Sequence, residues 1–147
     1  MPHHSEALIG STPGGPTLVV QPHAASPVAA VQVWFDVGSA DELEGEHGAC
    51  HFLEHLSFQG SLASAVEQLG GEANAFTGPD RTVFHATCPS ASLPDIAELL
   101  AQAVTGLEVP EADLETEKQV ICQEIRGRDA GAGQALQRAV FEAALPV

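Results

Sequence analysis

The sequence predicts an α+β fold, an α/β sandwich in which helices pack on one face of a mixed or antiparallel sheet. Pairs of short segments with strand character alternate with pairs of segments of helical periodicity, and most of the connections between them are short. The chain has 147 residues, 44% of them hydrophobic. It is therefore long enough for one domain with its own core and too short for two ordinary ones.

The first third of the chain predicts strands followed by a helix. Residues 1–16 are rich in Pro and Gly and predict a flexible lead-in or first turn. Residues 17–21 are a short β-rich run, and residues 27–38 alternate apolar and polar positions well enough for a strand. Residues 38–48 are a polar loop, and the largely apolar residues 49–58 predict a buried helix.

The rest of the chain returns to strands and then turns helical. Gly70 and Gly71 end the first of its helices, because glycine is the usual residue after a helix carboxyl end. The expected elements are a helix at 62–69, strands at 72–77 and 82–88, a helix from about Pro94, a helix from Pro110 to about Arg128, and a helix at 133–145.

Charge and cysteine content limit the function classes. Five Lys and Arg against twenty Asp and Glu give a formal net charge of −15, which argues against nucleic acid as a partner. The acidic balance either steers basic partners to the protein or serves solubility alone. Cys50, Cys88 and Cys122 are odd in number and include no CxxC pair, which favours a reducing compartment. Without a signal peptide or a membrane span in the sequence, we expect a cytoplasmic protein with no membrane partner.

Two histidines and a glutamate interrupt the apolar helix predicted at 49–58. On a helix, His51 and His55 lie one above the other on one face, and Glu54 lies beside them. The opposite side carries Phe52, Leu53 and Leu56. Burying two imidazoles and a carboxylate is costly unless each group has a partner.

A zinc ion would be such a partner. Neutral imidazole nitrogen is a good zinc ligand, and the spacing of four residues lets both rings bind one ion. Glu54, not needed as a ligand, would then take a proton from the water that zinc acidifies. The alternative is that both histidines are ordinary core or half-exposed residues; the H-x-x-E-H pattern argues against it because it carries a mechanism.

Catalytic zinc usually has a third protein ligand, and the helix predicted from Pro110 offers it. Glu117 and Glu124 are seven residues apart and share a face with Val120 and Ile121 between them. Glu124 is the predicted third ligand. Glu117 is predicted to orient a ligand histidine or the water; the alternative for Glu117 is a solvated acid on the helix face.

These two motifs resemble the signature of the pitrilysin/insulinase family of zinc peptidases, the inverzincins, which are related to the mitochondrial processing peptidases. The signature is H-x-x-E-H, here HFLEH at 51–55, followed downstream by E-x-x-x-x-x-x-E, here EKQVICQE at 117–124. Flanking segments at 38–48 and 69–86 also match, so the likeness covers residues 17–147. It implies that these residues are the amino-terminal portion of such a catalytic domain, incomplete relative to the family.

The resemblance implies roles for named residues. His51, His55 and Glu124 would bind zinc, and Glu54 would be the general base of a metalloendopeptidase. The strand containing Asn74, Ala75, Phe76 and Thr77 would bind an extended peptide substrate by adding it to the sheet edge; plain sheet structure is the alternative for that strand.

Two departures from the family pattern bear on function. Between His55 and Glu124 lie 68 residues, fewer than is usual, and the shortfall predicts a shortened helix beside the cleft with the zinc ligands intact. Family members also continue into a second, similar half that closes over the substrate. Either the chain is a fragment, or a partner chain or a second copy completes the cleft. The competing hypothesis is a binding or scaffold subunit of a two-chain peptidase, inactive without its partner.

Overall fold

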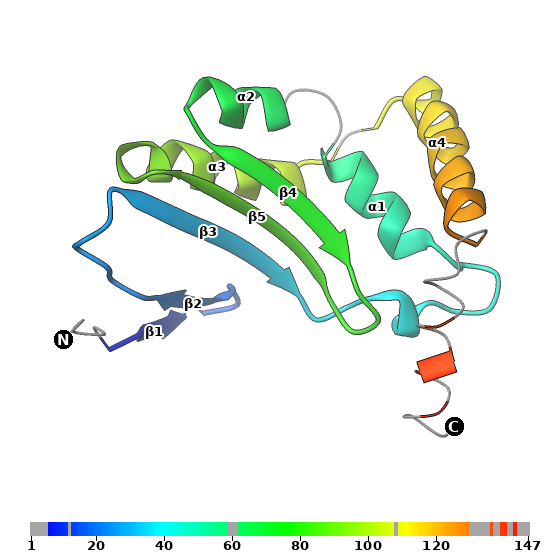
Figure 1. Ribbon diagram of the computed structural model, residues 1–147, viewed down its shortest axis with the longest axis horizontal. Coiled ribbons are helices and arrows are strands. Elements are labelled where there is room, and N and C mark those ends of the chain that lie inside the picture. The colour runs from blue at the N-terminus through cyan, green and yellow to red at the C-terminus, as the bar shows by residue number, and fades with distance from the viewer. Residues whose placement is uncertain are drawn as a thin grey trace.

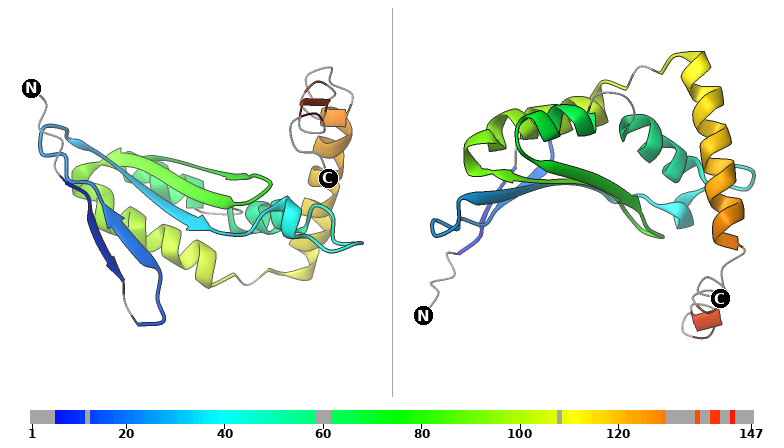
Figure 2. Two further views of the ribbon diagram at one scale, coloured as in Figure 1. Left: turned by 90° about the horizontal axis from the view of Figure 1, so that it is seen from below. Right: turned by 45° about the horizontal axis from the view of Figure 1, so that its top comes forward.

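An antiparallel three-stranded sheet organises the computed structural model, which describes residues 6–11, 13–58, 62–107 and 109–129 and four isolated positions, Leu136, Ala139, Val140 and Ala143. The strands are β3 (Val28–Phe35), β4 (Glu72–Thr77) and β5 (Thr82–Pro89), in the order β3-β5-β4. Helices lie along one face of this sheet (Figures 1 and 2). The predicted α+β class with helices on one sheet face is confirmed, and the sheet is antiparallel.

The register of the sheet explains which side chains meet the helices. Val33 of β3 and Ala75 of β4 both lie opposite Phe84 of β5. Residues directly opposite each other in an antiparallel pair point to the same side, so these three side chains share one face. Two helices pack on that face: α2 (Leu62–Gln68) contacts β4, and α3 (Leu93–Thr105) contacts β3 and β5.

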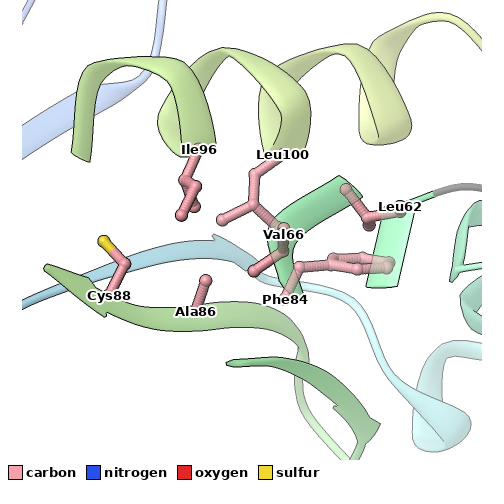
Figure 3. Close-up of a cluster of buried hydrophobic side chains, with 7 residues drawn as sticks. All are labelled: Leu62, Val66, Phe84, Ala86, Cys88, Ile96 and Leu100. Atoms are coloured by element: carbon pink, nitrogen blue, oxygen red, sulfur yellow. The ribbon is translucent and has the colours of Figure 1, made fainter. Parts of the chain in front are cut away.

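The core lies between these two helices and β5 (Figure 3). Val66, Ile96 and Leu100 are 0% exposed. Burying each such side chain contributes about 1.5–3 kcal/mol to stability. The rest of the buried cluster consists of Leu62, Phe84, Ala86 and Cys88.

Two further helices lie beside each other at one end of the sheet (Figures 1 and 2). They are α1 (Ala49–Phe58) and α4 (Glu111–Asp129); α1 contacts both β4 and α4. The predicted ends of α1 agree with the structure. Because α1 lies between the edge strand β4 and the long helix α4, side chains from three elements can meet at one place.

The loop before α1 is fastened to the turn between β4 and β5. The short 3-10 helix η1 (Ser39–Asp41) begins it. Ser39 N–H donates to the Gly78 carbonyl at 3.0 Å, and Ala40 N–H donates to the Pro79 carbonyl at 2.8 Å. A Cβ atom at Gly38 would lie 2.6 Å from that Pro79 oxygen, so this close approach requires glycine.

The amino-terminal expectation was incomplete. Within the lead-in expected at 1–16, β1 (Leu8–Ser11) pairs antiparallel with β2 (Thr17–Val20), and the two make a small separate sheet. Gly14, at φ +73°, lies in the connection between them. A four-residue strand is too short to show alternation above its Pro- and Gly-rich surroundings, which is why periodicity did not reveal it.

The helix at 49–58 was expected to be buried all round, but Leu53 is 53% exposed, because α1 is covered from the side of β4 and α4 and not on the side of Leu53. The helix expected at 133–145 lies largely outside the described residues. None of the helices in the described ranges is long and apolar enough to cross a bilayer.

Candidate functional site

The two histidines of α1 point toward the same place. Their Nε2 atoms lie 3.1 Å apart, and the rings meet edge to face with centroids 4.6 Å apart. This follows from helix geometry, since residues four apart lie on one face. The side chains are 16% exposed for His51 and 19% for His55, so the pair is largely removed from solvent.

A carboxylate from α4 completes a three-atom cluster. Glu124 Oε2 lies 3.8 Å from each of the two histidine Nε2 atoms. One ligand atom from each of His51, His55 and Glu124 lies within 4.8 Å of the other two. The side chains that the sequence predicted as metal ligands are therefore brought together, although 68 residues separate His55 from Glu124.

The spacing of these atoms suits zinc. Ligand atoms at about 2.0–2.1 Å from a tetrahedral ion lie roughly 3.3 Å from one another. The observed separations of 3.1, 3.8 and 3.8 Å lie on either side of that value. Two imidazoles and one carboxylate are also a donor set typical of catalytic zinc, which leaves a fourth position for water or substrate. The residues present therefore fit a zinc ion.

Glu117 touches the opposite nitrogen of one predicted ligand. Its Oε1 lies 2.7 Å from His55 Nδ1, and its side chain is 14% exposed. When Nε2 of His55 faces a metal, Nδ1 carries the proton and donates to this carboxylate. The contact is the one that the predicted orienting role requires, and the role itself stays a prediction.

Glu54 is the buried acid of the site, at 9% exposed. Its Oε2 accepts a hydrogen bond from Thr77 Oγ1 at 2.5 Å. Thr77 was predicted as part of the substrate strand, and no sequence pattern indicated this contact. It arises because Thr77 lies on the helix-facing side of β4, across from Thr82 in the register.

A pocket of about 280 Å³ adjoins the acid and the second histidine. Its lining comes from α1, α4 and the edge strand β4: Glu54, His55, Phe58, Asn74, Ala75 and Glu117. Phe58 was not predicted as a site residue. Its position three residues after His55, on the same side of the helix, is the signal that would have found it.

The predicted substrate strand is β4, which is an edge strand of the three-stranded sheet formed by the described residues. Asn74 and Phe76 point away from the helix-facing side, and Ala75 and Thr77 point toward it. An edge strand offers unpaired backbone groups to an added strand. Its use by a substrate stays a prediction.

Glu42, in the loop before α1, was not predicted as a site residue. Its Oε2 accepts the Gly48 N–H at 2.7 Å and its Oε1 accepts the Cys50 N–H at 2.9 Å. Burial acts to raise the pKa of Glu42, but these two backbone hydrogen bonds, together with the Cys50 thiol and the nearby His47, outweigh burial and lower the pKa below its ordinary value. Burial and the neighbouring Glu42 carboxylate raise the pKa of the Cys50 thiol.

Comparison with known proteins gives concordant matches. The profile of the insulinase family (peptidase family M16) matches residues 18–146. An uncharacterised zinc protease of Mycobacterium tuberculosis is 38% identical over 131 residues, which cover 84% of this chain and 30% of that protein. Cytochrome b-c1 complex subunit 1 of Rattus norvegicus, a mitochondrial protein, is 34% identical over 131 residues, which cover 84% of this chain and 26% of that protein.

Solved structures show the same fold. A protease from Helicobacter pylori superposes with a TM-score of 0.80 at 29% identity, over 86% of this chain and 32% of that one. Pitrilysin superposes with a TM-score of 0.82 at 23% identity, over 93% of this chain and 16% of that one, which bears on fold alone. The chain thus spans about a third or less of the length of these relatives.

Proposed function

Because the chain belongs to the insulinase family (peptidase family M16), we propose that it is the metal-binding part of a zinc metalloendopeptidase that hydrolyses extended peptides. The observation that carries the proposal is the convergence of His51, His55 and Glu124 beside a buried acid. Among the relatives, the M. tuberculosis protein is named as a zinc protease, which supports the same conclusion.

Each residue of the site has a task in this proposal. His51, His55 and Glu124 would hold zinc, which when bound supplies Lewis acidity toward water and toward the scissile carbonyl. Glu54 takes a proton from the attacking water as the water oxygen bonds to the carbonyl carbon. It then gives that proton to the amine nitrogen as the carbon–nitrogen bond breaks. Thr77 holds the Glu54 carboxylate in place.

The peptide would lie along β4. Backbone groups of Asn74 to Thr77 would pair with an extended substrate, which brings its carbonyl past the pocket formed with α1. The net charge of −15 favours basic peptides, because opposite charge raises the rate of encounter. A cytoplasmic location, as the three cysteines suggest, is part of the same proposal.

A second candidate function is a binding or scaffold subunit that cuts only with a partner chain or a second copy. One observation favours it: the rat relative is named as a subunit of a complex. The intact set of His51, Glu54, His55 and Glu124 favours the enzyme.

Metal analysis followed by peptide cleavage tests the proposal. We expect about one zinc per chain after purification without chelators, and cleavage of a mixed peptide library that stops on treatment with a chelator. Glu54→Gln should keep the zinc and lose cleavage, since it keeps the ligands and removes the base. Glu67→Gln, an exposed acid on α2, is the matched control and should cleave normally.

The outcomes separate the two functions. If the chain alone binds zinc but does not cleave peptides, and cleavage appears when a second chain of the family is added, the result would favour the subunit function. Cleavage that survives in Glu54→Gln would remove Glu54 from the mechanism. A purified protein that takes up no zinc would remove both the ligand assignment and the peptidase function.

A further inference from the structure

The helix that carries both histidines begins without a capping side chain of its own. Helices leave their first backbone N–H groups without intrahelical acceptors, and the residue just before the helix usually supplies one from its side chain. That residue here is Gly48, which has no side chain and adopts φ +92°. The start of α1 therefore needs an acceptor from elsewhere.

Glu42 supplies it from six residues upstream. Its two carboxylate oxygens accept the Gly48 N–H at 2.7 Å and the Cys50 N–H at 2.9 Å. The Cys50 amide belongs to the second residue of α1, the position that a capping side chain normally reaches. A negative charge at this end also interacts favourably with the helix dipole. The lowered pKa of Glu42 keeps that charge in place at neutral pH.

The position of Glu42 is itself fixed by the sheet. The residues just before it, Ser39 and Ala40, donate their N–H groups to the carbonyls of Gly78 and Pro79 in the β4–β5 turn. The Cys50 thiol lies 3.4 Å from the Gly38 carbonyl and adds a second link from the loop to α1. Glu42 thus connects the start of α1 to the turn that follows the predicted substrate strand.

The consequence falls on His51 more than on His55. His51 directly follows the capped Cys50 amide and lies in the first turn of α1, where helices fray most readily. His55 lies one turn further into the helix, and Glu117 holds its ring from the other side. Without Glu42, the first turn and its histidine would lose their anchor while Glu54 and His55 kept theirs.

We infer that Glu42 is a positioning residue for the metal centre: its carboxylate anchors the first turn of α1 so that the His51 ring stays in the geometry required to bind zinc. This inference rests on the proposed zinc site. It assigns Glu42 no contact with zinc or substrate.

Zinc affinity, measured on the full chain by competition with a chromophoric chelator, tests the inference without any assay of cleavage. We expect Glu42→Ala to bind zinc about tenfold or more weakly, the size typical for residues that orient metal ligands. Glu42→Gln keeps the length and one acceptor oxygen, so it should recover part of the affinity. Glu46→Ala removes an acid whose carboxylate bonds to Leu43 N–H within the same loop, at 3.4 Å, and should bind zinc like the wild type.

The result separates a positioning role from a role in stability alone. Circular dichroism and thermal unfolding of the zinc-free proteins would show whether each variant is folded at the assay temperature. Folded Glu42→Ala with the zinc affinity of the wild type would overturn the inference, whatever its melting temperature. If Glu42→Ala does not fold, Glu42→Gln decides in the same way. A wild-type protein that binds no zinc would instead reject the proposed function itself.

Discussion

The contact between Glu117 and His55 gives the sharpest prediction about the metal centre. Glu117 Oε1 lies 2.7 Å from His55 Nδ1, and the two side chains are 14% and 19% exposed. Replacement of Glu117 by Ala removes the acceptor, and replacement by Gln keeps a neutral one. In both variants, the three predicted ligands His51, His55 and Glu124 remain.

The expected loss follows from the geometry. A hydrogen bond that involves a charged group is worth about 1.5–3 kcal/mol when it is shielded from water. At about 1.4 kcal/mol for each factor of ten, Glu117→Ala should weaken zinc binding by about 10- to 100-fold. Because a neutral acceptor is roughly half as strong as a charged one, Glu117→Gln should lose only about three- to tenfold.

Competition with a chelator of known zinc affinity measures the effect. Glu115→Gln is the matched control: it lies two residues earlier on α4, is 64% exposed and faces Lys118 at 3.8 Å. It should bind zinc like the wild type, since an exposed ion pair contributes little. Equal zinc affinity in Glu117→Ala and the wild type would refute an orienting role for Glu117.

Three further predictions concern the acid, the core and the cap of α1. Thr77→Val should lower kcat by about tenfold and leave KM nearly unchanged in steady-state peptide cleavage, because it removes the donor to the Glu54 carboxylate and keeps the β-branched shape. Leu100→Ala should lower the free energy of unfolding in urea by about 2–5 kcal/mol, since Leu100 is 0% exposed. The pKa of Glu42 is lower in the folded state than its unfolded-state value of about 4.3, so the carboxylate stabilises the fold above that pH. This stabilisation is lost as the pH falls through the folded-state pKa. The difference in unfolding free energy between the wild type and Glu42→Gln should therefore be larger at neutral pH than in strong acid.

Each of these predictions has a control substitution at an exposed position. Thr87→Val, at an exposed position of β5, is the control for Thr77→Val and should leave kcat unchanged. If Thr77→Val raises KM and does not lower kcat, Thr77 would instead be assigned to substrate binding. Val28→Ala changes a side chain that is 52% exposed, so it should lower the free energy of unfolding far less than Leu100→Ala does. Glu44→Gln changes an exposed acid in the loop of Glu42 and should leave the pH dependence of the unfolding free energy as in the wild type. If Glu42→Gln also shows the wild-type pH dependence, the Glu42 carboxylate does not cap the start of α1.

Much of the fold was predictable because local periodicity and breakers mark most element ends. The helix at 49–58 and the strand at 72–77 agree with α1 and β4, and Gly70, at φ +79°, follows the end of α2 as expected. The strand at Leu8–Ser11 was not predictable, since its stability depends on pairing with β2 and not on its own pattern. The exposure of Leu53 likewise depends on which neighbours cover α1.

The sequence by itself determined the groups within single helices. A spacing of four residues places His51 above His55, and a spacing of seven places Glu117 and Glu124 on one face, because helix geometry is local. Only the tertiary structure decided that α4 lies against α1, so that Glu124 meets both rings. It alone brought Thr77 to Glu54 and Glu42 to the start of α1. These contacts join segments whose separation in the chain carries no periodic signal, and burial and hydrogen bonding in the packed fold select them.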